Sequence, residues 1–327
     1  MEILPYLDRY GEVDIFLSGA NNSLELDAPV KYRSKGLSLF YTHSGGLNYW
    51  EIIRKMSPLR LWKEVRDLPV EEYDLVINDF ECITALACAH KRVPSVQFGH
   101  QASFLSPKVP RPENRERMGE WLLRNYARAT QYIGLHFRQY DDFILPPVIK
   151  KDILQADPED MGHITVYLSS YSDAAVKRSL QPLKEFCFQV FSREVQRPVR
   201  YGNILFIPVS KGAFNKSLIT CKAILAGAGF ETPAEALYLG KKLMVIPIRG
   251  QYEQFCNAAA LSKMGVPVLH ALDDGFERSF RVWMEQKKIP HLHLDYSTES
   301  IVSYLMHHCG RGKADALDML YPDAVFN

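Results

Sequence analysis

The fold is decided by the stretch Ala223-Ile224-Leu225-Ala226-Gly227-Ala228-Gly229-Phe230-Glu231-Thr232-Pro233-Ala234-Glu235. Its first four residues predict a short buried strand, which passes through a Gly-x-Gly turn into the start of a helix. Gly227 and Gly229 lack a Cβ atom, so the backbone there can turn tightly and come close to a ligand. The turn is therefore a candidate binding loop, although a purely structural turn has the same signature.

The helix that follows carries its own start signals. Thr232 is a suitable N-cap residue, Pro233 suits the first helical position, and Glu235 completes a capping box with Thr232. The free N–H groups and the positive dipole end of such a helix form an anion site that suits a diphosphate. Two interpretations of Glu235 stay open at this point: a ligand of the nucleotide, or a cap alone.

Polar side chains also follow the next predicted strand, Leu243–Ile246. They lie in Arg249-Gly250-Gln251-Tyr252-Glu253-Gln254, ahead of Asn257. Ligands of open α/β sheets bind outside the carboxyl ends of the strands, which is where this segment falls. Glu253 and Gln254 offer the acceptors and donors that recognise sugar hydroxyls. The alternative is a solvated helix N-terminus.

Outward from these segments, short β-type runs alternate with longer helical patterns, as is typical of parallel α/β layers. The strands predicted in the second half are Ile164–Ser169, Cys187–Phe191, Asn203–Ile207, Ala223–Ala226, Leu243–Ile246 and Pro267–Leu269, with helices at Pro233–Leu239, Tyr252–Met264 and Phe276–Gln286. Those predicted in the first half are Val13–Ser18, Leu37–Tyr41, Tyr73–Asn78, Ser95–Phe98 and Ile133–His136, with helices at Met1–Tyr10, Glu81–Lys91 and Arg115–Thr130. The pattern stops at Leu145-Pro146-Pro147, where a charged linker begins. We predict two Rossmann-like doubly wound α/β domains, residues 1–150 and 151–327, that face each other across a cleft.

Composition excludes several classes of protein. The formal net charge of the 327 residues is +1, so no global basic field indicates a nucleic-acid partner. The six cysteines form no Cys-x-x-Cys pair, which argues against a zinc site and a disulfide framework. No signal peptide opens the chain and no apolar run approaches the ~20 residues that span a bilayer. We therefore expect a cytoplasmic protein.

The first half offers three candidates for a general base. Asn78-Asp79-Phe80-Glu81 closes one predicted strand, and Gly99-His100-Gln101 follows the next. Asp79, Glu81 or His100 could take the proton of an acceptor hydroxyl. For Asp79 the alternative is a cap of the following helix. The loop His43-Ser44-Gly45-Gly46 is a further candidate on the acceptor side.

No metal site is expected. Asp79-x-Glu81 has a spacing similar to that of known Asp-x-Asp metal clamps, but it lies in the first half of the chain, whereas the predicted diphosphate site lies in the second. The helix dipole and loop N–H groups of the second half can stabilise a departing diphosphate without a metal.

One predicted helix combines aromatic and basic residues. Trp121, Leu122 and Tyr126 lie among Arg115, Arg117, Arg124 and Arg128. A basic amphipathic stripe of this kind can lie on an anionic membrane, which would suit a lipid-linked acceptor. The alternative is a solvated face over an ordinary core.

The glycine loop and the polar segment after the next strand together resemble the donor-binding signature of GT-B glycosyltransferases, and in particular of glycosyltransferase family 28, which includes the lipid II-forming N-acetylglucosaminyltransferase of the cell envelope. The resemblance is specific between about Ile204 and Ala260. It implies that the diphosphate and ribose are held by Gly227, Gly229, Thr232 and Glu235, that Glu253 and Gln254 contact the donor sugar, that Ser169 and Ser170 face the phosphates, and that the backbone around Ile207 recognises the base. The family usually has Gln where this chain has Glu253, which leaves the sugar open.

The same resemblance bears on the start of the chain. Family members open with a strand and a Gly-x-Gly-His-type loop ahead of a helix like Met1–Tyr10. The sequence begins at that helix, so the first strand, the loop and its acceptor-side histidine are expected to be missing. A misassigned start, a truncation and an inactive relative are the three explanations.

The function implied by the resemblance is transfer of a hexosyl or N-acetylhexosaminyl group from a UDP-sugar to a hydroxyl acceptor. It would proceed with inversion and without metal or cofactor, and the acceptor could be lipid-linked, with peripheral contact at the inner membrane face. Two alternatives stay open: an enzyme like the non-hydrolysing UDP-N-acetylglucosamine 2-epimerases, and a nucleotide-sugar binding module without turnover.

Overall fold

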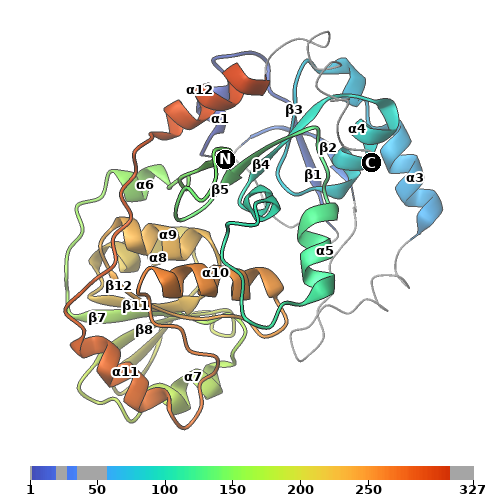
Figure 1. Ribbon diagram of the computed structural model, residues 1–327. Coiled ribbons are helices and arrows are strands. Elements are labelled where there is room, and N and C mark those ends of the chain that lie inside the picture. The colour runs from blue at the N-terminus through green and yellow to red at the C-terminus, as the bar shows by residue number, and fades with distance from the viewer. Residues whose placement is uncertain (1, 20–27, 35–56, 310–327) are drawn as a thin grey trace. The chain divides into compact units, whose positions relative to one another are not determined.

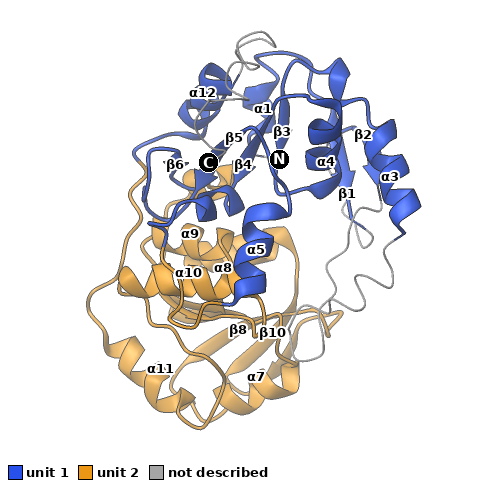
Figure 2. Ribbon diagram, turned by 45° about the vertical axis from the view of Figure 1, so that its right-hand side comes forward, with its two compact units in different colours: residues 1–109, 116–148, 295–327 blue, residues 110–115, 149–294 orange. Residues whose placement is uncertain are grey.

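The computed structural model describes residues 2–19, 28–34 and 57–309 (Figure 1). The chain forms two compact units, shown in different colours in Figure 2. Unit 1 comprises residues 1–109, 116–148 and 295–327, and unit 2 comprises residues 110–115 and 149–294. The second predicted domain, which ran to residue 327, therefore differs from unit 2 at its end.

The difference arises from the last described helix, α12 (Thr298–Cys309). It packs against α1 (Leu4–Leu7), and Arg9 forms an ion pair with Glu299. Ile301, Val302 and Leu305 bury the apolar side of α12. The chain thus returns to unit 1 after completing unit 2, a long-range pairing that local sequence patterns do not encode.

Unit 2 is a doubly wound α/β unit. Its sheet has the order β12-β11-β7-β8-β10-β9, and every neighbouring pair is parallel except β9 with β10. The strands are β7 (His163–Tyr167), β8 (Cys187–Ser192), β9 (Val199–Tyr201), β10 (Ile204–Pro208), β11 (Ala223–Gly227) and β12 (Lys242–Ile246). The helices are α6 (Lys151–Leu154), α7 (Asp173–Leu180), α8 (Lys211–Thr220), α9 (Glu231–Tyr238), α10 (Tyr252–Lys263) and α11 (Phe276–Glu285). Figure 1 shows α8, α9 and α10 on one face of this sheet and α7 and α11 on the other.

The central strands are buried on both faces. Residues 223–226 of β11 are all buried, as expected of a parallel strand between two helical layers. The predicted strand Pro267–Leu269 is wrong as an extended element, since Val268 forms only an isolated bridge with Val245. Pro267 has no N–H to donate. The segment contacts β12 through two hydrogen bonds, one from the amide of Val245 to the carbonyl of Pro267 and one from the amide of Leu269 to the carbonyl of Val245.

The strand order reverses next to β7. The chain runs from β7 outward through β8 to β10, then crosses back to β11 on the other side of β7 and continues to β12. The carboxyl ends of β7 and β11 therefore flank a topological switch point, the usual position of a ligand in an open α/β sheet.

Unit 1 contains two parallel sheets among its described residues. One pairs β1 (Ile15–Ser18) with β2 (Val30–Ser34), and the other has the order β3-β4-β5-β6. These four strands are β3 (Val76–Asn78), β4 (Ser95–Gly99), β5 (Gln131–Leu135) and β6 (Ile144–Leu145), and the remaining helices are α3 (Pro58–Asp67), α4 (Cys82–Lys91) and α5 (Arg117–Asn125). The predicted strand Leu37–Tyr41 lies outside the described residues. The predicted helix Met1–Tyr10 is reduced to the single turn α1.

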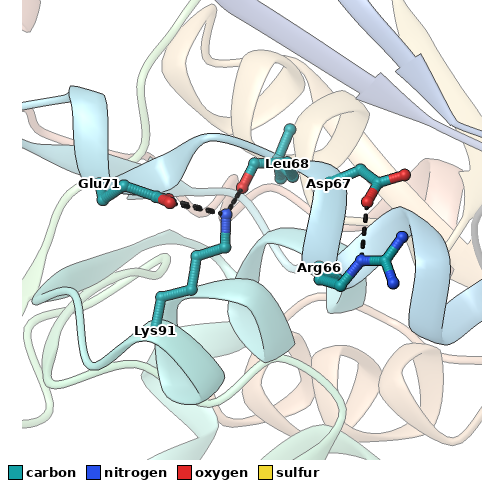
Figure 3. A network of polar contacts seen from close by, with 5 residues as sticks. All are labelled: Arg66, Asp67, Leu68, Glu71 and Lys91. Atoms are coloured by element: carbon teal, nitrogen blue, oxygen red, sulfur yellow. Dashed lines mark hydrogen bonds and ion pairs between the residues drawn. The ribbon is translucent and has the colours of Figure 1, made fainter.

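Helix α4 is fixed at its end by a polar network (Figure 3). Lys91 Nζ donates to the carbonyl of Leu68 at 2.6 Å and to the carboxylate of Glu71 at 2.8 Å, while Arg66 and Asp67 pair beside it at 3.0 Å. Beneath this network α3, α4 and β3 share a core that includes Val65, Val76 and Ile83. Within the described residues, no helix has the length and hydrophobicity needed to cross a membrane.

Candidate functional site

The Gly-x-Gly turn lies directly after β11, at the switch point of unit 2. Neither Gly227 nor Gly229 has a positive φ, so the turn does not depend on the left-handed conformation that favours glycine. What the two residues provide is space. A Cβ atom built on Gly229 would meet nothing within 4 Å, and one on Gly227 would lie 3.5 Å from Oε1 of Gln254. Gly229 is therefore a point at which a ligand could approach the backbone.

Helix α10 holds this loop in place. The side chain of Asn257 is completely buried, and its Nδ2 donates to the carbonyl of Ala228 at 3.1 Å. The hydrogen bond from Asn257 to this loop joins residues 29 positions apart, and no spacing within the polar segment predicts it.

The capping box predicted for α9 is wrong. The helix begins at Glu231, its N-cap residue is Phe230, and no side chain caps it. Thr232 and Pro233 therefore lie inside the first turn rather than at the N-cap and first positions. The amide groups of this first turn are left without a side-chain cap at the switch point, which is the arrangement that an anion can satisfy.

The side chain of Glu235 is used differently. It is 2% exposed, and its Oε1 lies 2.9 Å from Nζ of Lys150. Lys150 Nζ also lies 3.9 Å from the more exposed carboxylate of Glu231. Because α9 begins at Glu231, Glu235 lies in the second turn, beyond the position from which a capping-box side chain reaches back. The ion pair brings a cation to the start of α9 that no local sequence signal could have revealed.

The polar segment after β12 is stabilised by its own side chains. Gln254 Oε1 accepts from the amide of Ile248 at 2.9 Å, and its Nε2 donates to Oε1 of Gln251 at 2.8 Å. Glu253 is half-buried in the first turn of α10. Gln254 therefore shapes the loop beside Gly227. If Gln254 contacts a sugar, its side chain is already oriented by these two hydrogen bonds.

Ser169 and Ser170 are exposed in the turn between β7 and α7, on the other side of the switch point. Ser172 caps α7 by accepting from the amide of Ala175 at 3.3 Å. Burial raises the pKa of Asp173 in the first turn of α7, where the hydrogen bond from Ser192 Oγ at 2.7 Å opposes the effect.

Two further features complete this edge of the unit 2 sheet. Ile207 is half-buried near the end of β10, two strands from β7. Arg193, which the sequence analysis did not single out, follows β8 and donates to Tyr167 Oη at 3.2 Å. The predicted donor residues of unit 2 thus lie near the carboxyl ends of its parallel strands: Ile207 within β10, Gly227 at the end of β11, and the others in loops or in the first two turns of α9 and α10.

The candidate bases of unit 1 differ in their surroundings. Glu81 is the N-cap of α4, and its carboxylate accepts from the amides of Ile83 at 2.7 Å and Thr84 at 2.6 Å. The cap that was considered for Asp79 is therefore provided by Glu81. Asp79 is exposed, and its Oδ1 lies so close to the α-carbon of Gly99 that a Cβ there would be 2.5 Å away.

His100 lies within a buried aromatic cluster. It is 5% exposed, and its Nδ1 is 2.9 Å from the carbonyl of Leu135, which fixes the proton on Nδ1 in the neutral ring. The ring centroids of Phe104 and His136 lie 4.9 and 5.0 Å from that of His100. Tyr140 contacts His136 in turn, and burial raises its pKa. The loop His43-Ser44-Gly45-Gly46 lies outside the described residues.

The predicted basic helix is shorter than expected and spans Arg117–Asn125. Leu123 is buried, whereas Met118 and Trp121 are 47% and 58% exposed. No group of three or more His, Cys, Asp or Glu side chains that could hold a metal ion occurs in residues 2–19, 28–34 and 57–309.

Comparison with known proteins connects this geometry to a family. A model described as glycosyl transferase family 1 matches residues 3–278. No curated protein sequence matches the chain.

Solved structures extend the likeness to almost the whole chain. The glycotransferase of kitacinnamycin has a TM-score of 0.59 at 13% identity and covers 98% of this chain and 94% of its own. Spinosyn forosaminyltransferase has a TM-score of 0.57 at 14% identity with 95% of both chains covered. Arabidopsis thaliana UGT89C1 in complex with UDP-L-rhamnose has a TM-score of 0.53 at 15% identity, covering 98% and 94%. The α/β GT-B fold is therefore confirmed.

Proposed function

Since the chain belongs to glycosyl transferase family 1, we propose that this glycosyltransferase moves a hexosyl or N-acetylhexosaminyl group from a UDP-sugar to a hydroxyl acceptor. The observation that carries the proposal is the switch point of unit 2, where an open glycine turn, an uncapped helix start and the buried carboxylate of Glu235 follow one another along the chain. Two solved UGT89C1 structures are complexes with UDP and with UDP-L-rhamnose, which supports UDP as the nucleotide.

The donor would be held by groups with complementary chemistry. The N–H groups of the first turn of α9 suit the diphosphate, with Ser169 and Ser170 facing it from the end of β7. Thr232 in that first turn adds a hydroxyl donor. A carboxylate accepts up to about four hydrogen bonds, so Glu235 can accept from ribose hydroxyls while it pairs with Lys150.

The base and the sugar are recognised by the outer loops in this scheme. The backbone around Ile207 contacts the base, and Glu253 and Gln254 contact the sugar hydroxyls. These roles of Ile207, Glu253 and Gln254 follow from the resemblance to glycosyltransferase family 28. That resemblance is more specific than membership of glycosyl transferase family 1, and we propose it together with the function.

The chemical step would be an inverting displacement. Asp79 takes the proton from the acceptor hydroxyl, the acceptor oxygen forms a bond to the anomeric carbon, and the bond from that carbon to the diphosphate oxygen breaks. UDP leaves with the electron pair, and the N–H groups at the start of α9 stabilise its charge without a metal. Asp79 is favoured over Glu81, whose carboxylate caps α4, and His100, whose Nδ1 contacts the Leu135 carbonyl, is the second candidate.

A lipid-linked acceptor at the inner face of a cytoplasmic membrane belongs to the same proposal. It rests on Met118 and Trp121, which are 47% and 58% exposed on α5 beside Arg117 and Arg124. Cosedimentation with anionic vesicles that is weakened by Trp121→Ala would support it, whereas no sedimentation of the parent protein would remove this part.

The experiment for the central function is a UDP-release assay. The protein is incubated with UDP-glucose or UDP-N-acetylglucosamine, with and without alcohol acceptors and with a chelator as a control. Acceptor-dependent UDP release that persists in the chelator supports the transferase. Conversion of the sugar without UDP release would instead indicate an epimerase, and UDP binding without any turnover a binding module.

A further inference from the structure

The turn between β3 and α4 contains a strained residue beside the proposed base. Phe80 has φ 51°, in the left-handed region that residues with a side chain rarely adopt. Among the described residues, only Phe80 and Arg92 combine a side chain with a positive φ, and they flank the two ends of α4. Such strain persists only where the surrounding structure enforces it, and it concentrates at functional sites.

The residues on either side of the turn enforce this conformation. Asn78 is 3% exposed, its Nδ2 donates to the carbonyl of Glu81 at 2.6 Å, and its Oδ1 accepts from the amide of Glu81 at 2.8 Å. Glu81 is in turn fixed by its two bonds to the first amides of α4. Both ends of the turn are thus clamped together, and Asp79 and Phe80 form its apex.

The ring of Phe80 adds a third point of attachment. Its centroid lies 5.0 Å from that of Tyr126, the residue after α5, with the planes tilted by 39°. This contact holds the side chain of Phe80 to unit 1 on one side, so the preceding residue has little freedom to rotate.

The clamped turn directs Asp79 toward the neighbouring strand. The carboxylate rests against Gly99 at the end of β4, where any Cβ would be 2.5 Å from Oδ1. Phe80 and Gly99 therefore restrict Asp79 from two sides while its side chain stays exposed to solvent.

We infer that the left-handed turn at Phe80 is a positioning device that holds the carboxylate of Asp79 in its proton-accepting orientation, with Phe80 as a positioning residue rather than a catalytic one. The inference rests on the proposed role of Asp79 as the general base. It adds that the left-handed conformation of Phe80 contributes to the reaction rate through the position of the Asp79 carboxylate. A shift of about 1 Å in a reacting group can lower a rate about 100-fold.

The test replaces each strained residue by glycine, which adopts a positive φ readily. Arg92→Gly is the matched control, since it removes the same strain at the far end of α4. We expect Arg92→Gly to keep the parent kcat. Phe80→Gly should remain folded but lose roughly 10- to 100-fold in kcat, with the KM for the UDP-sugar and the affinity for UDP unchanged. Tyr126→Leu, which removes only the ring contact, should lower kcat in the same direction and serves if Phe80→Gly does not fold.

A double variant separates positioning from a structural role. In the Asp79→Asn background, Phe80→Gly should cause no further loss of kcat, because there is no carboxylate left to position. Two results would overturn the positioning role of Phe80 and leave Asp79 as the proposed base. One is a parent-like kcat in both Phe80→Gly and Tyr126→Leu. The other is an equal loss of kcat on adding Phe80→Gly to the parent and to Asp79→Asn. An Asp79→Asn variant with parent kcat would remove the base and the inference together, while the donor site would still be tested by UDP binding.

Discussion

Nζ of Lys150 lies 2.9 Å from Oε1 of Glu235, whose side chain is 2% exposed. The pair joins the residue before α6 to the second turn of α9, two segments that are far apart in the sequence. Removing one partner of a buried ion pair strongly destabilises the folded protein, because the other charge stays buried without compensation. The pair therefore gives Glu235 a structural role in addition to any role in binding. The two roles can be separated by substitution.

Glu235→Gln should weaken UDP binding by roughly tenfold or more, because hydrogen bonds from hydroxyls to a charged acceptor contribute about 1.5–3 kcal/mol each. It should also lower the melting temperature without ligand, since Lys150 loses its partner. Lys150→Met combined with Glu235→Gln should recover much of that stability but not the UDP affinity. Calorimetric UDP affinity and apo melting temperature are measured for the parent and the two variants, and a double variant that regains UDP affinity would leave Glu235 with a structural role only.

Asp79→Asn should lower kcat by about 10²–10⁴-fold, the usual contribution of a positioned general base. The amide cannot take a proton, but it occupies the same space beside Gly99, so folding should be unaffected. UDP affinity should also stay unchanged, because Asp79 belongs to unit 1 and the donor residues to unit 2. Steady-state UDP release at saturating donor measures the effect; a kcat within twofold of the parent would exclude Asp79.

Glu81→Ala should have the opposite profile. Its carboxylate accepts from the amides of Ile83 and Thr84, so its loss should reduce the free energy of unfolding by about 1 kcal/mol. The kcat of the folded variant should stay within a few-fold of the parent, because Asn78 bonds to the backbone of Glu81, which alanine retains. Denaturant unfolding and the UDP-release assay distinguish this cap from a base, and a large loss of kcat at full stability would show that Glu81 acts in catalysis.

His163 predicts an acid-sensitive contribution to stability. Burial lowers the pKa of its ring, although a contact with the Ser217 carbonyl at 3.2 Å opposes the effect. The folded protein therefore favours the neutral ring. Its contribution is complete above the unfolded pKa of about 6.5 and is lost as the pH falls toward the lower folded value. Between pH 7.5 and 5.5, His163→Gln should show a smaller drop in unfolding free energy than the parent; an equal drop in both would contradict this assignment.

Local patterns predicted most of unit 2 because its elements carry strong local signals. β11 is an apolar run that ends at Gly227, and α10 begins at the predicted Tyr252. The predicted start of α9 was wrong: Thr232 and Glu235 match a capping box, but the helix begins at Glu231 and the carboxylate of Glu235 pairs with Lys150, which lies far away in the sequence. Spacing within one helix carries no information about such a partner.

The candidate bases show the same limit. The sequence placed Asp79, Glu81 and His100 at strand ends, and the structure has β3 and β4 ending there. Which of them caps a helix and which is buried depends on hydrogen bonds and packing of neighbouring strands, such as the carbonyl of Leu135 beside His100. The left-handed φ of Phe80 was equally invisible, because nothing in an Asp-Phe-Glu sequence requires it.

The most direct test of the account is calorimetric titration of UDP into the parent protein and Gly229→Val. A Cβ at Gly229 meets nothing within 4 Å and the residue has no positive φ, so valine should leave the apo fold intact. Gly11→Val, at a site equally open in unit 1, is the control. We predict that the parent and Gly11→Val bind UDP alike while the folded Gly229→Val does not, because its side chain occupies the space of the diphosphate. Equal UDP affinity in Gly229→Val, or no binding by the parent, would contradict the proposed donor site.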